Sequence, residues 1–256
     1  DDPHIARLPI NSERVIGFAT TSAGFSYNPT LRATALCNKG EEGMQFILHI
    51  DDLEQQITVQ VPGVHNVSNC LAAAAIAHAA GVKAETITVA LSAFQSGDKR
   101  MQFMRLPGAI RVLNDCYNAN PSSMSAALQT VHNFGNHCKR LALLGDMLEL
   151  GQNAAESHHK LGKEVAELGY DRLALIGAFA GQVQQGAEQA GMAIKNIHVF
   201  ADTQAMADWL YHEIIRAKIT AGDWLLVKGS RGMRMEKVLE ETARRLESKT
   251  NKKKNS

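Results

Sequence analysis

The sequence predicts an α/β fold in which a parallel sheet, formed by the second half of the chain, carries helices on both faces. From residue 108 onward, short apolar runs alternate with segments of helix length, the pattern of parallel strands joined by crossover helices. The apolar runs are nearly continuous, as expected for strands that are buried on both faces. Pro107 and Gly108 precede this pattern and predict a boundary between a first domain, residues 1–107, and a second, residues 108–256.

The first domain is predicted to be β-rich and then helical. Short β-branched or alternating runs, separated by turn-forming clusters, predict four strands. These strands span residues 14–20, 32–37, 44–50 and 55–61. After Pro62 and Gly63, the alanine-rich run 67–80 predicts a helix, and residues 84–94 predict a second one. Residues 95–108 form a turn-rich passage.

The second domain is predicted to alternate five strands with five helices. The strands span residues 109–115, 139–146, 171–177, 196–200 and 223–229. The helices span residues 121–134, 154–169, 180–191, 203–218 and 233–248. The lysine-rich end, 248–256, favours a solvated terminus over a binding arm. Ligands of such sheets bind beyond the carboxyl ends of the strands, so the residues that follow each strand are the first candidates for a site.

The composition excludes several classes of protein. The 256 residues are 45% apolar and 21% charged, which is typical of a globular protein of one or two domains. A formal net charge of +1 argues against a general nucleic-acid or membrane-surface binder. The longest apolar run, residues 70–80, is too short for membrane insertion, and no signal-peptide pattern opens the chain. The four cysteines show neither CxxC pairs nor metal-ligand spacing, which favours free thiols in a reducing cytoplasm.

Polar residues collect after three strands of the second domain. The eleven residues 114–124, NDCYNANPSSM, combine acidic, amide, hydroxyl and aromatic side chains in one turn. The other two strand ends carry Asp146 and Glu149, and Lys228, Ser230 and Arg231. Carboxylates from one strand end and cations from another could converge on a zwitterionic ligand. The alternative is structural: Asp146 caps the following segment, Lys228 is solvated, and the turn collects Asn, Pro and Ser for backbone reasons.

Two further features lie before the predicted boundary. His65 and Asn66 precede Asn69 at a helix start, where one Asn is explained as a cap. The three-residue spacing places Asn66 and Asn69 on one helical face, where amides that both donate and accept suit an adenine edge. Arg100 lies in a loop, and a guanidinium is well suited to phosphate oxygens.

These motifs resemble those of the Mur ligases. The resemblance rests on PGVHNVSNCLAAAA, KRMQ, NDCYNANPSSMSAAL, LGDMLELG followed by His158, and LVKGSRGMRME, in this order and spacing. It covers nearly the whole chain. YNANP and GDMLELG resemble the branch of the family that adds D-alanyl-D-alanine, whereas the His-Asn helix start is shared across the family.

The resemblance implies a three-domain parent protein. Family members have an N-terminal UDP-sugar domain, a central P-loop ATPase domain and a C-terminal Rossmann-like domain. Residues 1–107 look like the later half of the central domain, residues 108–256 look like the C-terminal domain, and the opening DDP resembles the end of the family's NADDP segment. The pattern G-x-x-x-x-G-K-[ST] does not occur in these residues. The P-loop and the family's metal ligands are therefore expected upstream of residue 1, no metal ligand is expected in this chain, and the chain alone is not expected to turn over.

The resemblance also implies an activity and roles for residues. The family uses ATP with Mg²⁺ to activate a carboxylate as an acyl phosphate, which an amine then attacks; here the expected reactants are UDP-N-acetylmuramoyl-tripeptide and D-alanyl-D-alanine. The expected nucleotide contacts are Asn66, Asn69, Arg100, Asp115 and Asn118. The expected acceptor contacts are Asn120, Asp146, Glu149, His158, Lys228, Ser230 and Arg231. Asp115 is expected to be exposed in the cleft at its strand end.

Three other interpretations remain open from the sequence. The parent protein could be a sibling ligase that adds a different amino acid, or a folylpolyglutamate-type synthase. It could also be a non-catalytic module that binds a nucleotide or a peptide. An acidic or basic acceptor would need a matching charge cluster, and a panel of acceptor substrates separates the enzymes.

Overall fold

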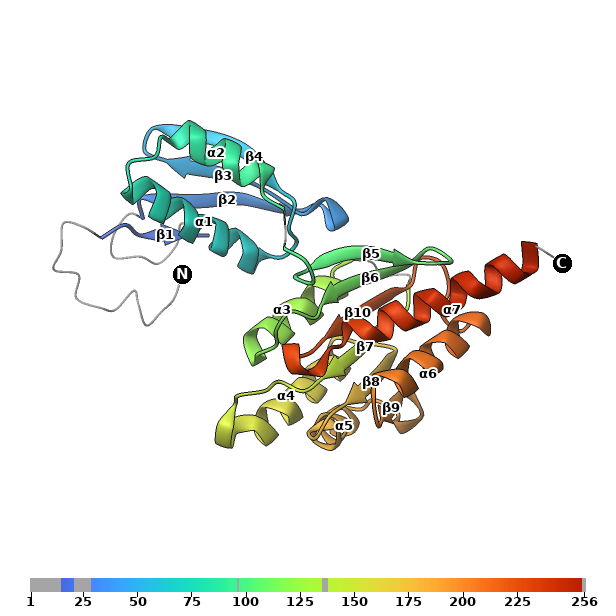
Figure 1. The fold of residues 1–256 in the computed structure, drawn as a ribbon. Helices are drawn as coiled ribbons and strands as arrows, with labels where there is room; N and C mark the ends of the chain where they lie inside the picture. The colour runs from blue at the N-terminus through green and yellow to red at the C-terminus, as the bar shows by residue number, and fades with distance from the viewer. Residues whose placement is uncertain (1–14, 21–28, 96, 135–137, 255–256) are drawn as a thin grey trace. The chain divides into compact units, whose positions relative to one another are not determined.

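The computed structural model describes residues 15–20, 29–95, 97–134 and 138–254. The chain forms two compact units, Asp1–Ser96 and Gly97–Ser256, and each is described by itself. Figure 1 shows the elements of both units. The opening DDP, which contributed to the sequence resemblance, lies outside the described residues.

The first unit is built on a four-stranded sheet. Its strands are β1 (Phe18–Ala19), β2 (Leu31–Asn38), β3 (Met44–Ile50) and β4 (Leu53–Val59), in that spatial order. β1 runs parallel to β2, and the other neighbours are antiparallel. β2, β3 and β4 confirm the predicted strands. The strand predicted at 14–20 is confined to the two residues of β1.

Two helices pack on this sheet, α1 (Val64–Ala79) and α2 (Ala84–Ala93). Every second residue of β3 is buried, as expected for a strand with one face against a core. These residues pack with Leu71 of α1 and Ile87 of α2 in one apolar cluster. α1 starts directly after Gly63, whose φ of 91° suits glycine, and so begins before the predicted residue 67.

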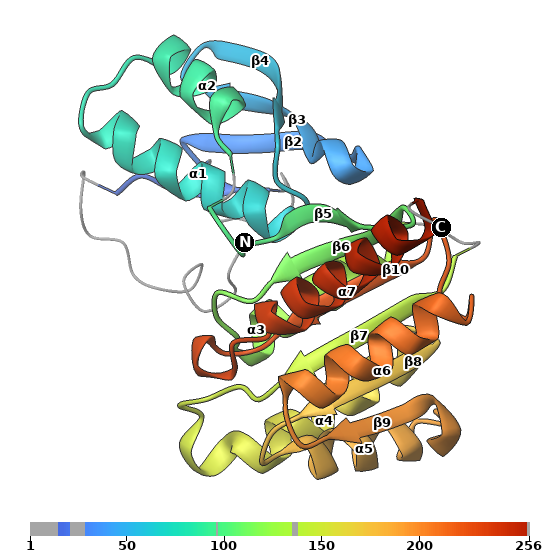
Figure 2. The ribbon, with the colours of Figure 1, turned by 45° about the vertical axis from the view of Figure 1, so that its right-hand side comes forward.

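The second unit contains the predicted parallel sheet (Figure 2). Its strands are β5 (Gln102–Leu106), β6 (Ile110–Asp115), β7 (Arg140–Gly145), β8 (Arg172–Ile176), β9 (Ile197–Phe200) and β10 (Trp224–Lys228). The spatial order is β5-β6-β10-β7-β8-β9, so the last strand in the sequence lies between β6 and β7. All pairings are parallel except that of β5 with β6.

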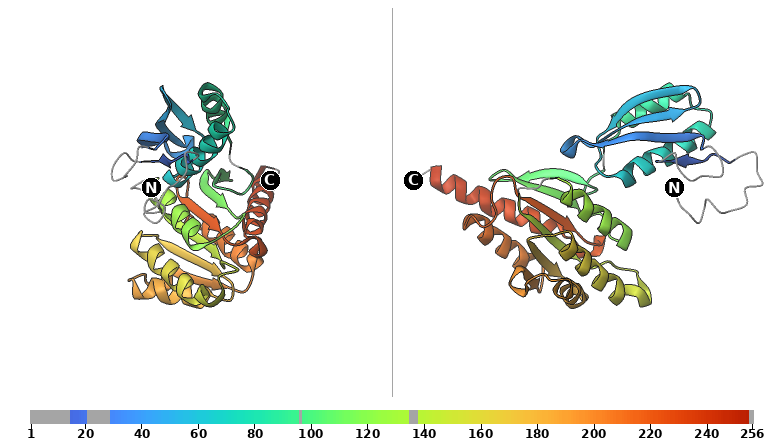
Figure 3. Two further views of the ribbon diagram at one scale, coloured as in Figure 1. Left: turned by 90° about the vertical axis from the view of Figure 1, so that its left-hand side faces the viewer. Right: turned by 180° about the vertical axis from the view of Figure 1, so that it is seen from behind.

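Helices cover both faces of this sheet (Figure 3). They are α3 (Pro121–His132), α4 (Ala154–Glu167), α5 (Ala180–Gln189), α6 (Thr203–Ile215) and α7 (Glu236–Lys254). One apolar core joins α3, α4 and α5 to one face, and a second joins α6 and α7 to the other. Neighbouring strand residues alternate between the cores: Leu113 and Leu226 lie in the first, Val112 and Leu225 in the second. The fold class predicted from the sequence is confirmed.

Strand β5 corrects two sequence predictions. Residues 102–106 were assigned to a turn-rich passage, but they pair antiparallel with β6 from Leu106 opposite Ile110 to Gln102 opposite Asn114. Pro107 and Gly108 therefore belong to the hairpin turn inside the second unit. The boundary between the units falls earlier, after Ser96, because β5 belongs to the same sheet as β6.

Helix α7 is longer than predicted: it continues to Lys254, beyond the predicted end at residue 248.

Helices α4 and α5 approach each other until their backbones touch. A Cβ atom at Gly162 would lie 1.8 Å from the carbonyl oxygen of Val183, and one at Gly186 would lie 2.0 Å from that of His159. Only glycine permits this spacing.

Candidate functional site

The candidate site is the rim where β6, β10 and β7 end side by side. After β6 the chain passes to α3 on one face of the sheet, whereas after β10 it passes to α7 on the other. Neighbouring parallel strands whose helices diverge in this way open a crevice at their carboxyl ends, where α/β proteins bind ligands. The ends of these strands and the loops that follow them carry most of the predicted site residues.

Asp115 and Lys228 form a buried ion pair at the centre of the rim. They are register partners at the last positions of β6 and β10, and the ammonium group of Lys228 contacts Oδ2 of Asp115. Lys228 also donates to the carbonyl oxygen of Asn118 at 2.9 Å, and Oδ1 of Asp115 accepts from the backbone N–H of Met101 at 2.9 Å. Lys228 is 1% exposed and Asp115 7%. The expectation that Asp115 is exposed in the cleft is therefore wrong, because its carboxylate is paired within the protein.

The loop after β6 is organised by its amides. Asn120 is the N-cap of α3: its Oδ1 accepts from the N–H of Ser123 at 2.8 Å, and the Ser123 hydroxyl accepts from the N–H of Asn120 at 3.1 Å. This reciprocal capping box, followed by Pro121 at the first helical position, explains why this loop is rich in Asn, Pro and Ser. Oδ1 of Asn118 accepts from the N–H of Ala119 at 2.9 Å, and the Asn118 side chain is exposed.

Asp146 holds the start of α5. Its carboxylate accepts from the backbone N–H of Ala178 at 2.7 Å and from that of Phe179 at 3.2 Å. Gly177 precedes these donors, and a Cβ atom there would lie 2.2 Å from the Asp146 carboxylate. A carboxylate at a helix start is favourable because it pairs with N–H groups that have no partner within the helix. The structure thus gives Asp146 a structural role, but at the start of α5 and not at the segment that follows it in the sequence.

His158 fixes the loop after β7. Its Nε2 accepts from the N–H of Met147 at 2.9 Å and its Nδ1 donates to the carbonyl oxygen of Ala154 at 2.7 Å, so the ring is the neutral Nδ1–H tautomer. The ring is 1% exposed and stacks on Phe179 at a centroid distance of 4.6 Å. Asp146 Oδ1 lies 3.8 Å from Nε2, which accepts a hydrogen bond and has no proton to donate.

Ser230 connects the three loops. Its hydroxyl accepts from the N–H of Leu148 at 2.8 Å and donates to the carbonyl oxygen of Ala119 at 3.4 Å, while its own N–H donates to the carbonyl oxygen of Asp146 at 3.0 Å. The side chain is buried. These hydrogen bonds therefore hold the loops after β6, β7 and β10 together as one rigid support, which is called the base of the rim below.

Above this base, several side chains are exposed. Arg231 opens the short 3₁₀ turn η5 (Arg231–Met233) and is about half exposed. Glu149 is exposed at a φ of 65°, a left-handed conformation that is uncommon outside glycine and clusters at functional sites. The guanidinium of Arg100 lies 3.8 Å from the ring centroid of Tyr117, which is also exposed.

Three residues of this rim were missed from the sequence: Lys99, Tyr117 and Glu236. Glu236 starts α7, is buried, and accepts from Arg231 at 2.7 Å and from Lys99 at 3.2 Å. Burial opposes its ionisation, yet its own backbone N–H and the hydrogen bonds from Arg231 and Lys99 lower the pKa of Glu236. The sequence contained one possible signal of this buried acid. Glu236 is followed by Val238 and Leu239 at the start of a predicted helix, and apolar residues at that spacing place this face of the helix against the core.

Cys116 is a buried free cysteine beneath the same cluster. Its thiol donates to the carbonyl oxygen of Val227 at 3.3 Å. Burial raises the pKa of the Cys116 thiol, and the nearby carboxylates of Glu236 and Asp115 raise it further. A thiol in this state is a poor nucleophile, so the cysteine acts in packing.

In the first unit, Asn66 and Asn69 lie on one face of α1 as predicted. The Asn69 amide donates to Oδ1 of Asn66 at 3.2 Å, and the Asn66 amide donates to the carbonyl oxygen of Pro62 at 2.7 Å. Asn69 is exposed, and Asn66 is partly so. The pair presents amide groups beside the start of the helix, which suits a ligand edge that both donates and accepts.

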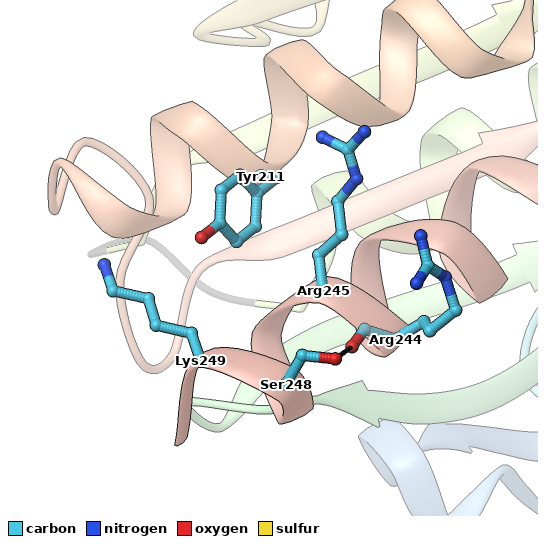
Figure 4. A pocket seen from close by; sticks show the side chains of 5 residues that line it. All are labelled: Tyr211, Arg244, Arg245, Ser248 and Lys249. Atoms are coloured by element: carbon cyan, nitrogen blue, oxygen red, sulfur yellow. Dashed lines mark hydrogen bonds between the residues drawn. The ribbon is translucent and has the colours of Figure 1, made fainter. Parts of the chain in front are cut away.

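A separate pocket of about 400 Å³ lies between α6 and α7, near the far end of α7 (Figure 4). Its lining residues are Tyr211, Arg244, Arg245, Ser248 and Lys249. Glu241 pairs with both arginines, and Arg245 also pairs with Asp208, so the cations of this pocket are largely neutralised. None of the predicted site residues lines it.

Two properties concern the described part of the chain as a whole. Within it, no helix combines the length and the apolar character that crossing a membrane requires. In the same residues, His, Cys, Asp and Glu side chains do not gather in any group of three that could hold a metal ion. Both oxygens of Asp115 and of Asp146 already accept hydrogen bonds within the protein.

Comparisons with known proteins identify the family of the chain. The family model described as "Mur ligase, glutamate ligase domain" matches residues 99–231. Because this match covers half of the chain, the chain belongs to the Mur ligase family.

Several similar curated relatives carry the name UDP-N-acetylmuramoyl-tripeptide–D-alanyl-D-alanine ligase. The protein of Buchnera aphidicola is 28% identical over 90% of this chain and 46% of its own length. That of Mycobacterium bovis is 30% identical over 90% of this chain and 47% of its own. A crystal structure of MurF from Acinetobacter baumannii superimposes with a TM-score of 0.75 at 28% identity, over 90% of this chain and 47% of that one. The chain thus spans about half the length of the relatives it matches.

Proposed function

We propose that this chain is the C-terminal part of an ATP-dependent amide ligase of peptidoglycan precursor synthesis, which joins D-alanyl-D-alanine to UDP-N-acetylmuramoyl-tripeptide. The observation that carries the proposal is the rim of the second unit. There, exposed groups of both charge signs, Arg231 and Glu149, lie on a rigid base of buried, internally paired polar residues. The similarity to relatives of that name along 90% of the chain supports the choice of reaction.

The acceptor dipeptide is a zwitterion, and the rim supplies a partner for each end. Arg231 can grip the carboxylate with the N–H donors that do not face Glu236, since a guanidinium binds carboxylates in bidentate fashion. Glu149 is the exposed carboxylate of the neighbouring loop and suits the ammonium end. The sequence predicted that Asp146 binds the ammonium group, but Asp146 is buried against the start of α5. Ser230 and Lys228 support the site from below.

The reaction needs two balanced steps. Transfer of the γ-phosphoryl group of ATP to the terminal carboxylate of the tripeptide gives an acyl phosphate and ADP. The deprotonated amine of the dipeptide then attacks the acyl carbon, the C–N bond forms, and phosphate leaves. The chain's own residues contribute by binding and orienting the reactants, which is the main source of catalysis in phosphoryl transfer.

Nucleotide contacts are proposed for each unit separately. In the first unit, Asn66 and Asn69 are proposed to contact the adenine ring of the nucleotide. In the second unit, Arg100, Asn118 and Asp115 are proposed to contribute to nucleotide binding. Because both oxygens of Asp115 are already bonded, its proposed contribution is to hold Lys228 and the adjoining backbone. Mg²⁺ is proposed to bind to residues other than those described here. The free thiols of all four cysteines support a reducing cytoplasmic location.

Steady-state kinetics on the longer protein that carries this chain test the proposal. Turnover should require ATP, the tripeptide precursor and D-alanyl-D-alanine; activity with a single amino acid or with L-glutamate instead would identify a sibling ligase or a folylpolyglutamate-type synthase. Arg231→Ala should raise KM for D-alanyl-D-alanine more than KM for ATP. Arg234→Ala, an exposed arginine three residues on, is the matched control. Equal effects of Arg231→Ala on both substrates, or none, would remove Arg231 from the acceptor site.

A further inference from the structure

Glu236 is a buried carboxylate with no role in the proposed reaction. It is the first residue of α7, and 6% of it is exposed. It therefore cannot itself bind a reactant at the surface. A buried carboxylate is costly unless it is paired, so its partners indicate what it does.

Both partners of Glu236 are cations, and they bind the same oxygen. Arg231 donates to Oε1 at 2.7 Å and Lys99 donates to it at 3.2 Å. Lys99 lies in the segment before β5 and Arg231 in the turn after β10, so Glu236 joins two segments that are far apart in the sequence. Tyr117 adds to this arrangement, because its backbone N–H donates to the carbonyl oxygen of Lys99 at 3.0 Å and fixes the backbone there.

The exposure of the three side chains is graded. Glu236 is buried, the Lys99 side chain is 24% exposed and the Arg231 side chain is 53% exposed. The carboxylate thus lies beneath the two cations. A single Nη1–H of Arg231 donates to Glu236, which leaves guanidinium donors for another ligand. With Glu236 ionised, the three side chains carry a net charge of +1.

The two oxygens of the Glu236 carboxylate differ in their contacts. Oε2 is buried and receives no hydrogen bond from another residue in the described part of the chain. Here both cations converge on one oxygen, which brings their charges together on the outer side.

We propose that Glu236 is a positioning residue that holds Arg231 and Lys99 as a two-cation receptor for an oxyanion of a reactant. The shared chemistry is a carboxylate or a phosphoryl group; the acceptor dipeptide carries the first and the nucleotide the second. Only the identity of the oxyanion rests on the function proposed above. Glu236 acts by fixing two long, flexible side chains before the ligand arrives, which removes their ordering cost from binding.

The sign of one measurement separates this role from simple electrostatics. Glu236→Gln keeps the shape of the side chain and removes its charge, so the net charge of the cluster rises from +1 to +2. If charge alone governed binding, the oxyanion would bind more tightly. If Glu236 positions the cations, KM for the oxyanion substrate rises roughly 2- to 12-fold, the affinity equivalent of ordering one long side chain.

The kinetic experiment compares Glu236→Gln with Glu240→Gln, an exposed glutamate one turn further along α7. The expected result is a higher KM for either D-alanyl-D-alanine or ATP in the first variant, with kcat within about twofold of the parent value and no change in the second variant. A rise for D-alanyl-D-alanine identifies the carboxylate, and a rise for ATP identifies the phosphoryl group. An unchanged or lower KM for both substrates overturns the proposal.

A double-mutant cycle tests whether Glu236 acts through Arg231. In an Arg231→Met background, Glu236→Gln should raise KM by a smaller factor than it does in the parent protein, because one of the two cations that it positions is already absent. Full additivity overturns the proposal. Lys99→Met provides a second route if the Glu236 variant does not fold: it removes one cation of the receptor, should raise the same KM, and overturns the proposal if it does not.

Direct binding keeps this test independent of the reaction. Titration of the parent protein with sodium phosphate and, separately, with D-alanyl-D-alanine at constant ionic strength can be followed by the NMR signals of the arginine side chains. A shift of the Arg231 signal that is lost in Glu236→Gln supports the receptor even if ligase turnover is never observed, in which case only the proposed function fails. No shift of Arg231 with either probe overturns the receptor.

Discussion

Replacing Lys228 with methionine measures the cost of leaving the Asp115 carboxylate buried without its counter-charge. Methionine fills much of the same space and removes the ammonium group. Asp115 would then keep one hydrogen bond, from the N–H of Met101, and its carboxylate would stay buried without a counter-charge. Breaking a buried pair by removing one partner costs about 3–5 kcal/mol. We expect the free energy of unfolding to fall by that amount at neutral pH.

Tryptophan fluorescence during urea unfolding reports this loss. The two tryptophans of the chain, Trp209 and Trp224, both lie in the second unit, and Trp224 is buried in its core. With a slope of about 2 kcal/mol per molar urea, a loss of 3–5 kcal/mol lowers the midpoint by about 1.5–2.5 M.

Two control variants complete the experiment. Lys195→Met removes an exposed lysine and should change stability by no more than about 0.5 kcal/mol. Adding Asp115→Asn to Lys228→Met removes both charges and should recover most of the loss, because no uncompensated charge remains. If Lys228→Met alone unfolds within about 1 kcal/mol of the parent chain, the pair is not what holds these strand ends, and the reasoning fails.

Three further predictions concern individual groups of the second unit. Asn120→Ala should destabilise it by about 1 kcal/mol in urea, because α3 loses its N-cap; an unchanged midpoint would contradict the capping role. Gly177→Ala should cost more than about 1 kcal/mol by thermal denaturation, since the new methyl meets the Asp146 carboxylate at a φ of 128°, and a neutral result would show that the loop can relax. Glu241 should titrate by NMR with a pKa of about 2, chiefly because Arg244 donates to it. Its stabilising effect is therefore complete above about pH 4.5 and lost as the pH falls toward 2, and Arg244→Gln should move the pKa back up.

The alternation of elements in the second unit was predictable because it depends on local sequence. Buried parallel strands are apolar along their whole length, and the helices between them are long enough to recognise. β5 was missed because it is an edge strand with exposed Gln102 and Arg105, set among turn-forming residues. Its pairing depends on the hairpin at Pro107–Gly108, which the composition alone presents as a boundary.

The internal chemistry of the rim was not predictable, because it depends on strand order. Nothing in the periodicity shows that β10 enters between β6 and β7, so the pairing of Asp115 with Lys228 is invisible in the sequence. The sequence correctly located the polar residues at the strand ends. It did not show which face outward, as Arg231 does, and which are consumed in holding the loops together, as Asp146 and His158 are.

The contact between α4 and α5 has a consequence at the level of the gene. At Gly162 and Gly186 the backbone of one helix occupies the space that a side chain of the other would need. Every missense change in a glycine codon adds at least a Cβ atom. No single-nucleotide change at either codon therefore gives an amino acid that fits the available space. Drift at these two sites should be confined to synonymous codons, or else accompanied by compensating changes that move the helices apart. A library of random variants selected only for folded protein should therefore be depleted of substitutions at both positions.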